Sequence, residues 1–168
     1  MKLYHYAPSE NTVLSEGLLS LAKSKKDLRC YAHRASSEDK QKIFEWLDST
    51  FPGRTKSISC LTEPIKWYGN DPILKKIADA SVLFSFELKE LAEAGLIEAI
   101  WCKDGSSADG HNEKFYQIEV SEIDLSPLSW HKCCVEKGLL YAVIRHYLLV
   151  IKDGVIPPKY ITQEKQPS

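Results

Sequence analysis

The chain has 168 residues, of which 43% are hydrophobic and 27% are charged, a composition typical of a soluble globular protein and not of a disordered or fibrous one. This length predicts a single domain that can bury a core. The formal net charge is −1, so no overall positive field indicates nucleic-acid binding, although a local basic patch is compatible with it. Because the sequence contains no secretory leader and no apolar run of about 18 residues, we expect a cytoplasmic protein that does not contact a membrane.

The expected elements of the first half alternate irregularly between strands and helices. Alternating apolar and polar residues predict the strands, and apolar residues at helical spacing predict the helices. Ser9 or Asn11 can cap the first helix, and Pro52-Gly53 ends the second. In chain order we expect a strand at 3–7, a helix to about residue 21, a charged turn at 23–27, a short strand at 28–33, a helix from 36 to 51 and a strand at 56–61.

In the second half, the strongest prediction is a strand at residues 81–88, which is rich in β-branched and aromatic residues. The segment 141–151 predicts a long buried strand, with a helix as the alternative. The other expected elements are a short helix at 72–80, a helical turn at 89–94, a strand at 96–102, a polar loop at 103–114, a strand at 115–120 and a short helix at 133–138.

The predicted total is six or seven strands and three or four helices, without regular βαβ alternation. That pattern favours an α+β fold with mainly antiparallel strand pairing. Residues 1–161 are expected to form one domain, and the polar residues 162–168 are expected to form a disordered tail.

The five cysteines are an odd number, which favours unpaired thiols in a reducing compartment over a disulfide framework. A metal site would use His131 together with the adjacent Cys133 and Cys134. Zinc-binding cysteines are usually separated by about two to four residues, so that both thiolates can reach one ion. We therefore expect no metal site.

Common catalytic motifs are absent from the sequence. It has no Walker A loop, no Gly-x-Gly-x-x-Gly fingerprint, no Gly-x-Ser-x-Gly elbow and no His-Glu-x-x-His motif. A cysteine hydrolase would need one Cys and one His brought together by the fold. Five residues of each type allow too many pairs for any one of them to be favoured.

Three short segments resemble proteins of the ADP-ribosyltransferase-fold superfamily. Residues 3–18, LYHYAPSENTVLSEGL, resemble its opening, in which a Leu-x-His strand precedes a helix that ends in Gly-Leu. Residues 147–161, YLLVIKDGVIPPKYI, resemble its closing strand and tail, and residues 57–65, SISCLTEPI, are similar to a strand of abortive-infection and toxin-like members. Poly(ADP-ribose) polymerases and tRNA 2′-phosphotransferases belong to the same superfamily. The resemblance covers a minority of the chain and implies a split-sheet ADP-ribosyltransferase-like fold.

The resemblance also implies NAD as the substrate and three roles for side chains. A histidine on the first strand donates a hydrogen bond to the adenosine ribose, and an aromatic residue stacks on the nicotinamide. A glutamate polarises the nicotinamide ribose and stabilises the positive charge that develops there, while the other contacts position the substrate. His5 matches the family histidine. Without the resemblance, a lone histidine on a strand is an ordinary structural residue.

The aromatic residue has several candidates. Tyr31, in the segment Arg29-Cys30-Tyr31-Ala32, resembles the family tyrosine, and a half-buried strand tyrosine is the alternative. Ser59 is a competing pocket residue if the strand at 56–61 faces the ligand. The pair Trp67-Tyr68 offers another stacking surface, although aromatic residues near a proline turn usually pack.

Glu113 is the predicted catalytic glutamate, together with His5, because it follows the polar loop and precedes the strand at 115–120. A solvated loop carboxylate is its alternative role, and Glu119 is the alternative glutamate. In a toxin branch of the superfamily the glutamate lies on the closing strand. Here residues 145–149, RHYLL, contain no acid, and this departure leaves open a domain of this fold without turnover.

Several basic residues could form a rim that attracts phosphate groups, or simply a solvated face. They are Lys23, Lys25, Lys26, Arg29, Arg34 and Lys56.

We therefore predict an NAD-dependent ADP-ribosyltransferase-like protein, with NAD bound between the strand of His5 and the strand at 56–61. Its acceptor is an unknown protein or nucleic acid, as for a bacterial toxin, effector or phage-defence component. One alternative is a catalytically inactive binding module of the same fold. Another is an RNA 2′-phosphotransferase-like enzyme, which the near-neutral net charge disfavours.

Overall fold

A computed structural model describes residues 1–62, 64, 76, 79–103, 115–119 and 146–165. Its strands are β1 (Lys2–Pro8), β2 (Leu18–Leu19), β3 (Ser57–Leu61), β4 (Ser81–Glu87), β5 (Ile97–Lys103), β6 (Phe115–Ile118), β7 (His146–Ile151), β8 (Val155–Ile156) and β9 (Thr162–Glu164). Its helices are α1 (Val13–Glu16), α2 (Arg29–Ala35), α3 (Lys40–Thr50) and α5 (Leu88–Glu93), with the 3-10 turns η1 (Arg54–Lys56), η3 (Lys152–Gly154) and η4 (Pro158–Tyr160).

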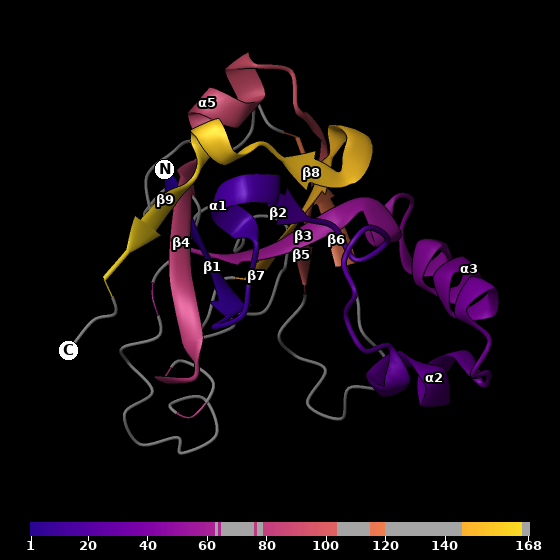
Figure 1. Cartoon of the computed structure of the whole chain (residues 1–168). Coiled ribbons are helices and arrows are strands. Elements are labelled where there is room, and N and C mark those ends of the chain that lie inside the picture. The colour runs from indigo at the N-terminus through magenta and orange to yellow at the C-terminus, as the bar shows by residue number, and fades with distance from the viewer. Residues whose placement is uncertain (63, 65–75, 77–78, 104–114, 120–145, 166–168) are drawn as a thin grey trace.

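Within these residues, seven strands form one sheet in the order β6-β5-β7-β3-β1-β4-β9, and β2 pairs with β8. Each of the described pairs is antiparallel. Helices α2 and α3 lie beside each other at one side of the sheet, and α5 follows β4 directly at the end of the sheet (Figure 1). The predicted α+β class with mainly antiparallel pairing is confirmed.

The core extends across the large sheet from β6 to β4. In β4, residues 83–86 are all buried, so side chains on both faces of this strand are covered. Leu3, Ile58 and Leu149 of neighbouring strands belong to the same apolar cluster. Burying side chains of this size stabilises the fold by about 1.5–3 kcal/mol each.

The sheet divides between β1 and β3. Strand β1 pairs with β4 along all seven of its residues, and β3 pairs with β7 along all five of its residues. Although β1 and β3 are described in full, the register between them consists of Tyr4 opposite Leu61. Beyond this pair the strands diverge toward Pro8 and Ser57. The two halves of the sheet therefore open away from each other at this end.

The expected helix that extends to residue 21 is wrong in its length, because α1 ends at Glu16. Gly17 has a φ of 88°, and a Cβ there would collide with the carbonyl oxygen of Ile156. Since only glycine accommodates both the left-handed conformation and this close approach, the chain leaves the helix here and enters β2. The N-cap of α1 is Thr12 and not Ser9 or Asn11, but Asn11 Oδ1 accepts a hydrogen bond from the backbone N–H of Val13 at 3.1 Å and so satisfies one donor at the helix start.

The expected strand at 28–33 is also wrong, since this segment forms α2. The six-residue alternation of apolar and polar residues was too short to exclude a helix. All seven residues of α2 are described and none of them is buried. No buried sheet face therefore requires alternate residues of this segment to point to one side, as they would in a strand. It packs instead against α3, whose cap Asp39 accepts a hydrogen bond from the backbone N–H of Lys42.

The chain after residue 161 differs from the expected disordered tail. Thr162–Glu164 forms β9 and extends the sheet at the edge of β4. Ser85 Oγ donates to Glu164 Oε1 at 2.5 Å, and Lys2 Nζ forms an ion pair with the same oxygen at 3.1 Å. These contacts hold the segment against the sheet.

Strands β1, β3, β4, β5 and β6 agree with the sequence prediction to within a few residues, and β7 is the described part of the expected strand at 141–151. The short strands β2 and β8 were not predicted. The expected helix at 133–138 and the polar loop from residue 104 onward lie outside the described residues. So does most of the expected helix at 72–80, of which residues 76 and 79–80 are described.

Candidate functional site

A pocket of about 790 Å³ opens where β1 and β3 diverge. This volume lies within the range of about 300–1,000 Å³ that is common for small-molecule sites. The pocket is lined by residues of both strands, of the chain between β2 and α2, of α2 and of η1, including His5, Tyr6, Lys25, Lys26, Tyr31, Arg54, Ser57, Ile58, Ser59 and Phe115. His5, Tyr31 and Ser59, which the sequence proposed as ligand-binding residues, therefore surround a single pocket.

His5 connects the two strands where their backbones no longer pair. Its Nδ1 lies 2.6 Å from the carbonyl oxygen of Ser59, and because a carbonyl oxygen only accepts, Nδ1 carries the proton and donates. Burial lowers the pKa of His5, the positive charge of Lys26 lowers it further, and the hydrogen bond to Ser59 opposes both effects. His5 is therefore neutral near pH 7, with an unprotonated Nε2.

The position of this proton bears on the role that the resemblance implies for His5. A neutral imidazole that donates through Nδ1 offers only an acceptor at Nε2. His5 would therefore accept a hydrogen bond from a ligand hydroxyl, whereas the family resemblance implied that it donates one. A ribose hydroxyl can satisfy either arrangement, since a hydroxyl group is both a donor and an acceptor.

Tyr31 reaches the pocket from α2, not from a strand as expected, and it is half-buried. The guanidinium carbon of Arg54 lies 5.8 Å from the centre of its ring. A contact of this kind restrains the ring through the attraction of a cation for a π face. Tyr31 is thus held at the pocket wall with support from η1.

Arg54 is a pocket residue that the sequence did not reveal. It is 7% exposed, and its Nη1 donates to Thr50 Oγ1 at 2.9 Å. Four aromatic rings lie around its guanidinium carbon, with centroid distances of 4.7 Å to Phe115, 5.7 Å to Trp46, 5.8 Å to Tyr31 and 5.9 Å to Phe51. The available signal was an arginine directly after Pro52-Gly53 at the end of an aromatic-rich helix.

The charged residues around this pocket are mainly basic. Lys25 and Lys26, which are exposed, and Arg54 line it, together with the acid Glu10. Of the other residues in the expected basic rim, Lys56 forms an ion pair with Glu98 at 2.9 Å and does not line the pocket. The pocket is therefore suited to a ligand with negative charge.

The predicted catalytic Glu113 lies outside the described residues, as do Trp67 and Tyr68. The alternative, Glu119, is exposed just after β6 and does not line the pocket. Phe115, at the start of the same strand, does line it. The pocket thus adjoins β6 at the end that follows Glu113 in the sequence.

The three described cysteines do not line the pocket. Cys60 and Cys102 are buried and Cys30 is exposed, and none of the three forms a disulfide. Burial raises the pKa of Cys60 far above its ordinary value, which keeps the thiol protonated and unreactive. Among the described residues, no three His, Cys, Asp or Glu side chains gather in a group that could hold a metal ion. His131, Cys133 and Cys134 lie outside them.

No helix in the described part of the chain is long and apolar enough to cross a membrane.

Comparisons with known proteins add no relative. No protein-family model matches the chain, and neither the curated proteins nor the solved structures contain a match. Function is therefore inferred from the pocket and from the sequence around it.

Proposed function

We propose that the pocket between β1 and β3 binds NAD and that the protein is an ADP-ribosyltransferase-like enzyme with a macromolecular acceptor. One observation carries this proposal. His5 and Tyr31 resemble the ligand-binding residues of that superfamily, Ser59 is the competing pocket residue on the strand at 56–61, and all three line one pocket at the position where the sheet divides. These three residues are at least 26 positions apart in the sequence, so sequence proximity alone would not gather them in one pocket.

The groups around the pocket match the parts of NAD. Tyr31 offers a ring on which the nicotinamide can stack. Nε2 of His5 accepts a hydrogen bond from a hydroxyl of the adenosine ribose. Lys25 and Lys26 attract the diphosphate, whose charge is opposite to theirs.

The chemistry requires stabilisation of positive charge on the nicotinamide ribose. When the bond between ribose C1′ and the nicotinamide nitrogen breaks, nicotinamide leaves with the bonding electrons and C1′ becomes electron-poor. A carboxylate that polarises the 2′-hydroxyl stabilises this centre, and the rest of catalysis is positioning. Glu113 is assigned this role by its sequence context, because Phe115, two residues later, lines the pocket.

A catalytically inactive binding module is the second candidate. Strand β7 (His146–Ile151) carries no acid, although one toxin branch of the superfamily has its glutamate on the closing strand. In such a module the pocket would bind NAD and would not turn it over. The net charge of −1 disfavours a third candidate, an RNA 2′-phosphotransferase-like enzyme. The basic residues of the pocket nevertheless suit a phosphate group.

Saturation-transfer NMR with millimolar NAD tests binding. We expect saturation of the nicotinamide and ribose protons in the wild type, and loss of the nicotinamide signal in Tyr31→Leu. Lys26→Ala should weaken binding, whereas Lys42→Ala, an equal change of charge at an exposed residue of α3 that does not line the pocket, should not. Absence of NAD binding to the wild type would contradict the proposal.

A labelling assay with fluorescent NAD then tests turnover. The enzyme proposal predicts that Glu113→Gln binds NAD as the wild type does and loses labelling. Binding of NAD without labelling that depends on Glu113 would favour the inactive module instead.

A further inference from the structure

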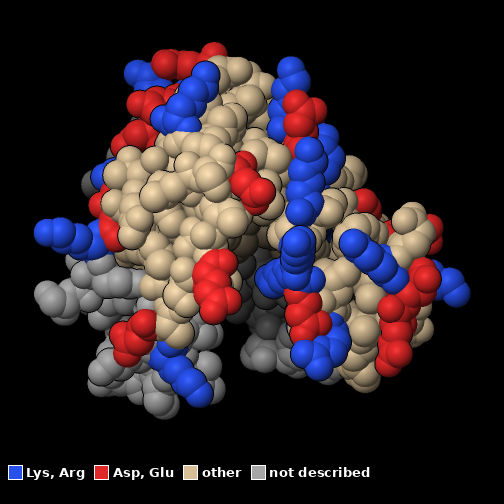
Figure 2. All heavy atoms as spheres, in the orientation of Figure 1, with Lys and Arg blue, Asp and Glu red and all other residues tan. Residues whose placement is uncertain are grey.

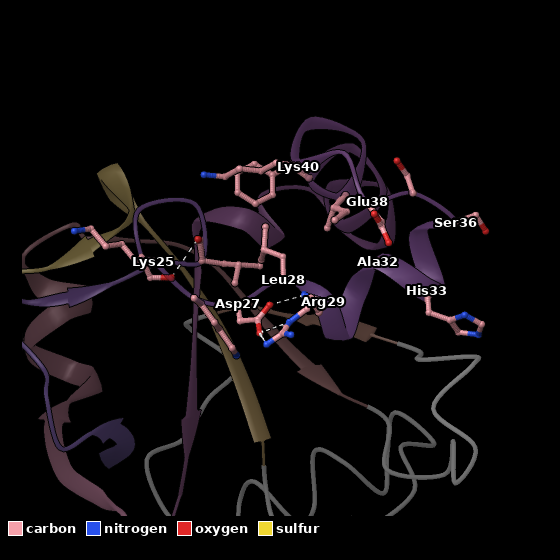
Figure 3. Close-up of a pocket in the computed structure, with 15 residues that line it drawn as sticks. Lys25, Asp27, Leu28, Arg29, Ala32, His33, Ser36, Glu38 and Lys40 are labelled. Carbon is pink, nitrogen blue, oxygen red and sulfur yellow. Dashed lines mark hydrogen bonds and ion pairs between the residues drawn. The ribbon is translucent and has the colours of Figure 1, made fainter.

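A second hollow, of about 1060 Å³, lies beside the NAD pocket. It is bordered by the chain from Leu21 to Arg29 and by α2 and α3 (Figure 3). Leu21, Ser24, Lys25 and Lys26 line both hollows. A molecule bound in the second hollow would therefore be adjacent to a ligand in the first.

The floor of this hollow is apolar and its rim is basic. Leu28, Ile43 and Phe44 supply apolar surface. Phe44 is half-buried, and Nζ of Lys40 lies 5.4 Å from the centre of its ring. The basic residues of the rim are Lys25, Lys26, Arg29 and Lys40.

The acids of the rim offset only part of this charge. They are Asp27 and Glu38, and Asp27 is occupied by Arg29, whose Nη2 lies 2.6 Å from its Oδ2. The hollow is thus net positive in a chain whose net charge is −1. Figure 2 shows Lys and Arg side chains, with some acids between them, in a column between the body of the sheet and the α2–α3 part.

We propose that this second hollow binds single-stranded nucleic acid and that this strand is the acceptor of the ADP-ribose. Single strands are bound by basic grooves that follow the phosphates and by aromatic rings on which bases stack, and the rim and Phe44 supply these two features. An acidic peptide would match the charge of the rim, but it would not use a ring at the floor in this way.

The role of the nucleic acid as acceptor rests on the proposed function, whereas its binding in the second hollow does not. In the transfer, a nucleophilic oxygen or nitrogen atom of the nucleic acid forms a bond to C1′ of the nicotinamide ribose. Nicotinamide leaves with the electrons of the C1′–N bond, and the proton of the nucleophile passes to solvent. Because Lys25 and Lys26 line both hollows, NAD and the nucleic acid would meet at the boundary between them.

Fluorescence anisotropy with labelled oligo(dT) and oligo(U), in the absence of NAD, tests the binding. We expect the single strands to bind more tightly than a duplex of equal length, with a logarithmic salt slope of about −0.7 for each phosphate that is contacted. Phe44→Leu preserves an apolar side chain and removes the stacking ring, so it should weaken binding about tenfold.

Charge reversal provides the matched pair of variants. Lys40→Glu should weaken binding and make the salt slope less negative by about 0.7, whereas Lys42→Glu, on the same helix and outside the hollow, should leave the slope unchanged. No binding at low salt, equal losses in the two lysine variants, or stronger competition by poly-glutamate than by oligo(U) would overturn the proposal. Because NAD is absent, these results do not depend on whether the first pocket binds NAD.

Discussion

The two sides of β1 differ in how they meet their neighbours. Toward β4, the strand pairs along its whole length, and the opposing residue of His5 is Phe84, which is 1% exposed. Toward β3, the described register contains one pair, and the side chain of His5 bonds to the carbonyl of Ser59 in place of a backbone ladder. The same strand thus forms core on one side and a pocket wall on the other.

This difference separates residues that stabilise the fold from residues that are available to a ligand. A buried carbonyl needs a hydrogen-bond donor, and where the strands diverge, Ser59 receives one from a side chain. Because Nδ1 of His5 makes this bond, the Ser59 carbonyl keeps a hydrogen-bond partner while Nε2 takes no part in the contact. Changes on the β4 side should therefore reduce stability, and changes on the β3 side should alter binding or pH dependence.

The largest effect is expected on the paired side. Phe84→Ala removes a ring that is 1% exposed in the core and should lower the free energy of unfolding by about 3–5 kcal/mol. Urea unfolding followed by circular dichroism measures it. Tyr31→Ala, at the half-buried pocket wall, is the matched comparison, and a loss of equal size there would remove the distinction between the two sides.

Gly17→Ala should have the next largest effect, because it strains the turn between α1 and the β2–β8 pair. The φ of 88° and the close carbonyl of Ile156 exclude a Cβ without movement of the β2–β8 pair. We expect a loss of about 1–3 kcal/mol in the same unfolding measurement. Gly95→Ala is the control, since its φ is also positive, at 69°, but no atom lies within 4 Å of the added Cβ. Equal losses in both variants would show that the close approach does not matter.

His5 should give stability a moderate dependence on pH. Its pKa in the folded state lies below the ordinary value of about 6.5, so between these two values the unfolded chain binds more protons. Stability is therefore complete above about pH 6.5 and falls as the pH decreases, by at most about 1.4 kcal/mol per pH unit for this group.

Unfolding of the wild type and of His5→Gln between pH 5 and pH 7 tests this dependence, because glutamine can donate to Ser59 but does not titrate. The slope of the wild type should exceed that of His5→Gln. Identical slopes would mean that His5 does not titrate as a buried group.

The smallest effect concerns the thiols. Cys30 is exposed on α2 and Cys60 is buried in β3, so Cys30→Ser should remove a thiol that reacts rapidly with a disulfide reagent such as DTNB. Cys60→Ser should leave the rapid phase unchanged. Rapid reaction of Cys60 in the native protein would indicate that β3 is not held against β7 as described.

The sequence predicted the strands well where alternation and β-branched residues extended over a whole element, as in β4. The prediction failed at α2, where a pattern of six residues is compatible with both a strand and a helix. It also failed at β9, where polar residues pair at a sheet edge that composition does not reveal. His5 and Ser59 lie in short segments that resemble the superfamily, and both line the pocket. Arg54 was missed because an arginine becomes buried only when separate elements bring aromatic rings around it, and no local pattern encodes that arrangement.

The central claim is that Nε2 of His5 faces a site for NAD. Long-range ¹H–¹⁵N NMR spectra of the histidine rings, assigned with His5→Gln, test it directly. We predict a neutral His5 ring protonated at Nδ1, and a shift of its Nε2 resonance that saturates as NAD is added and that Tyr31→Leu weakens. An Nε2 resonance that NAD leaves unchanged at millimolar concentration would contradict the claim.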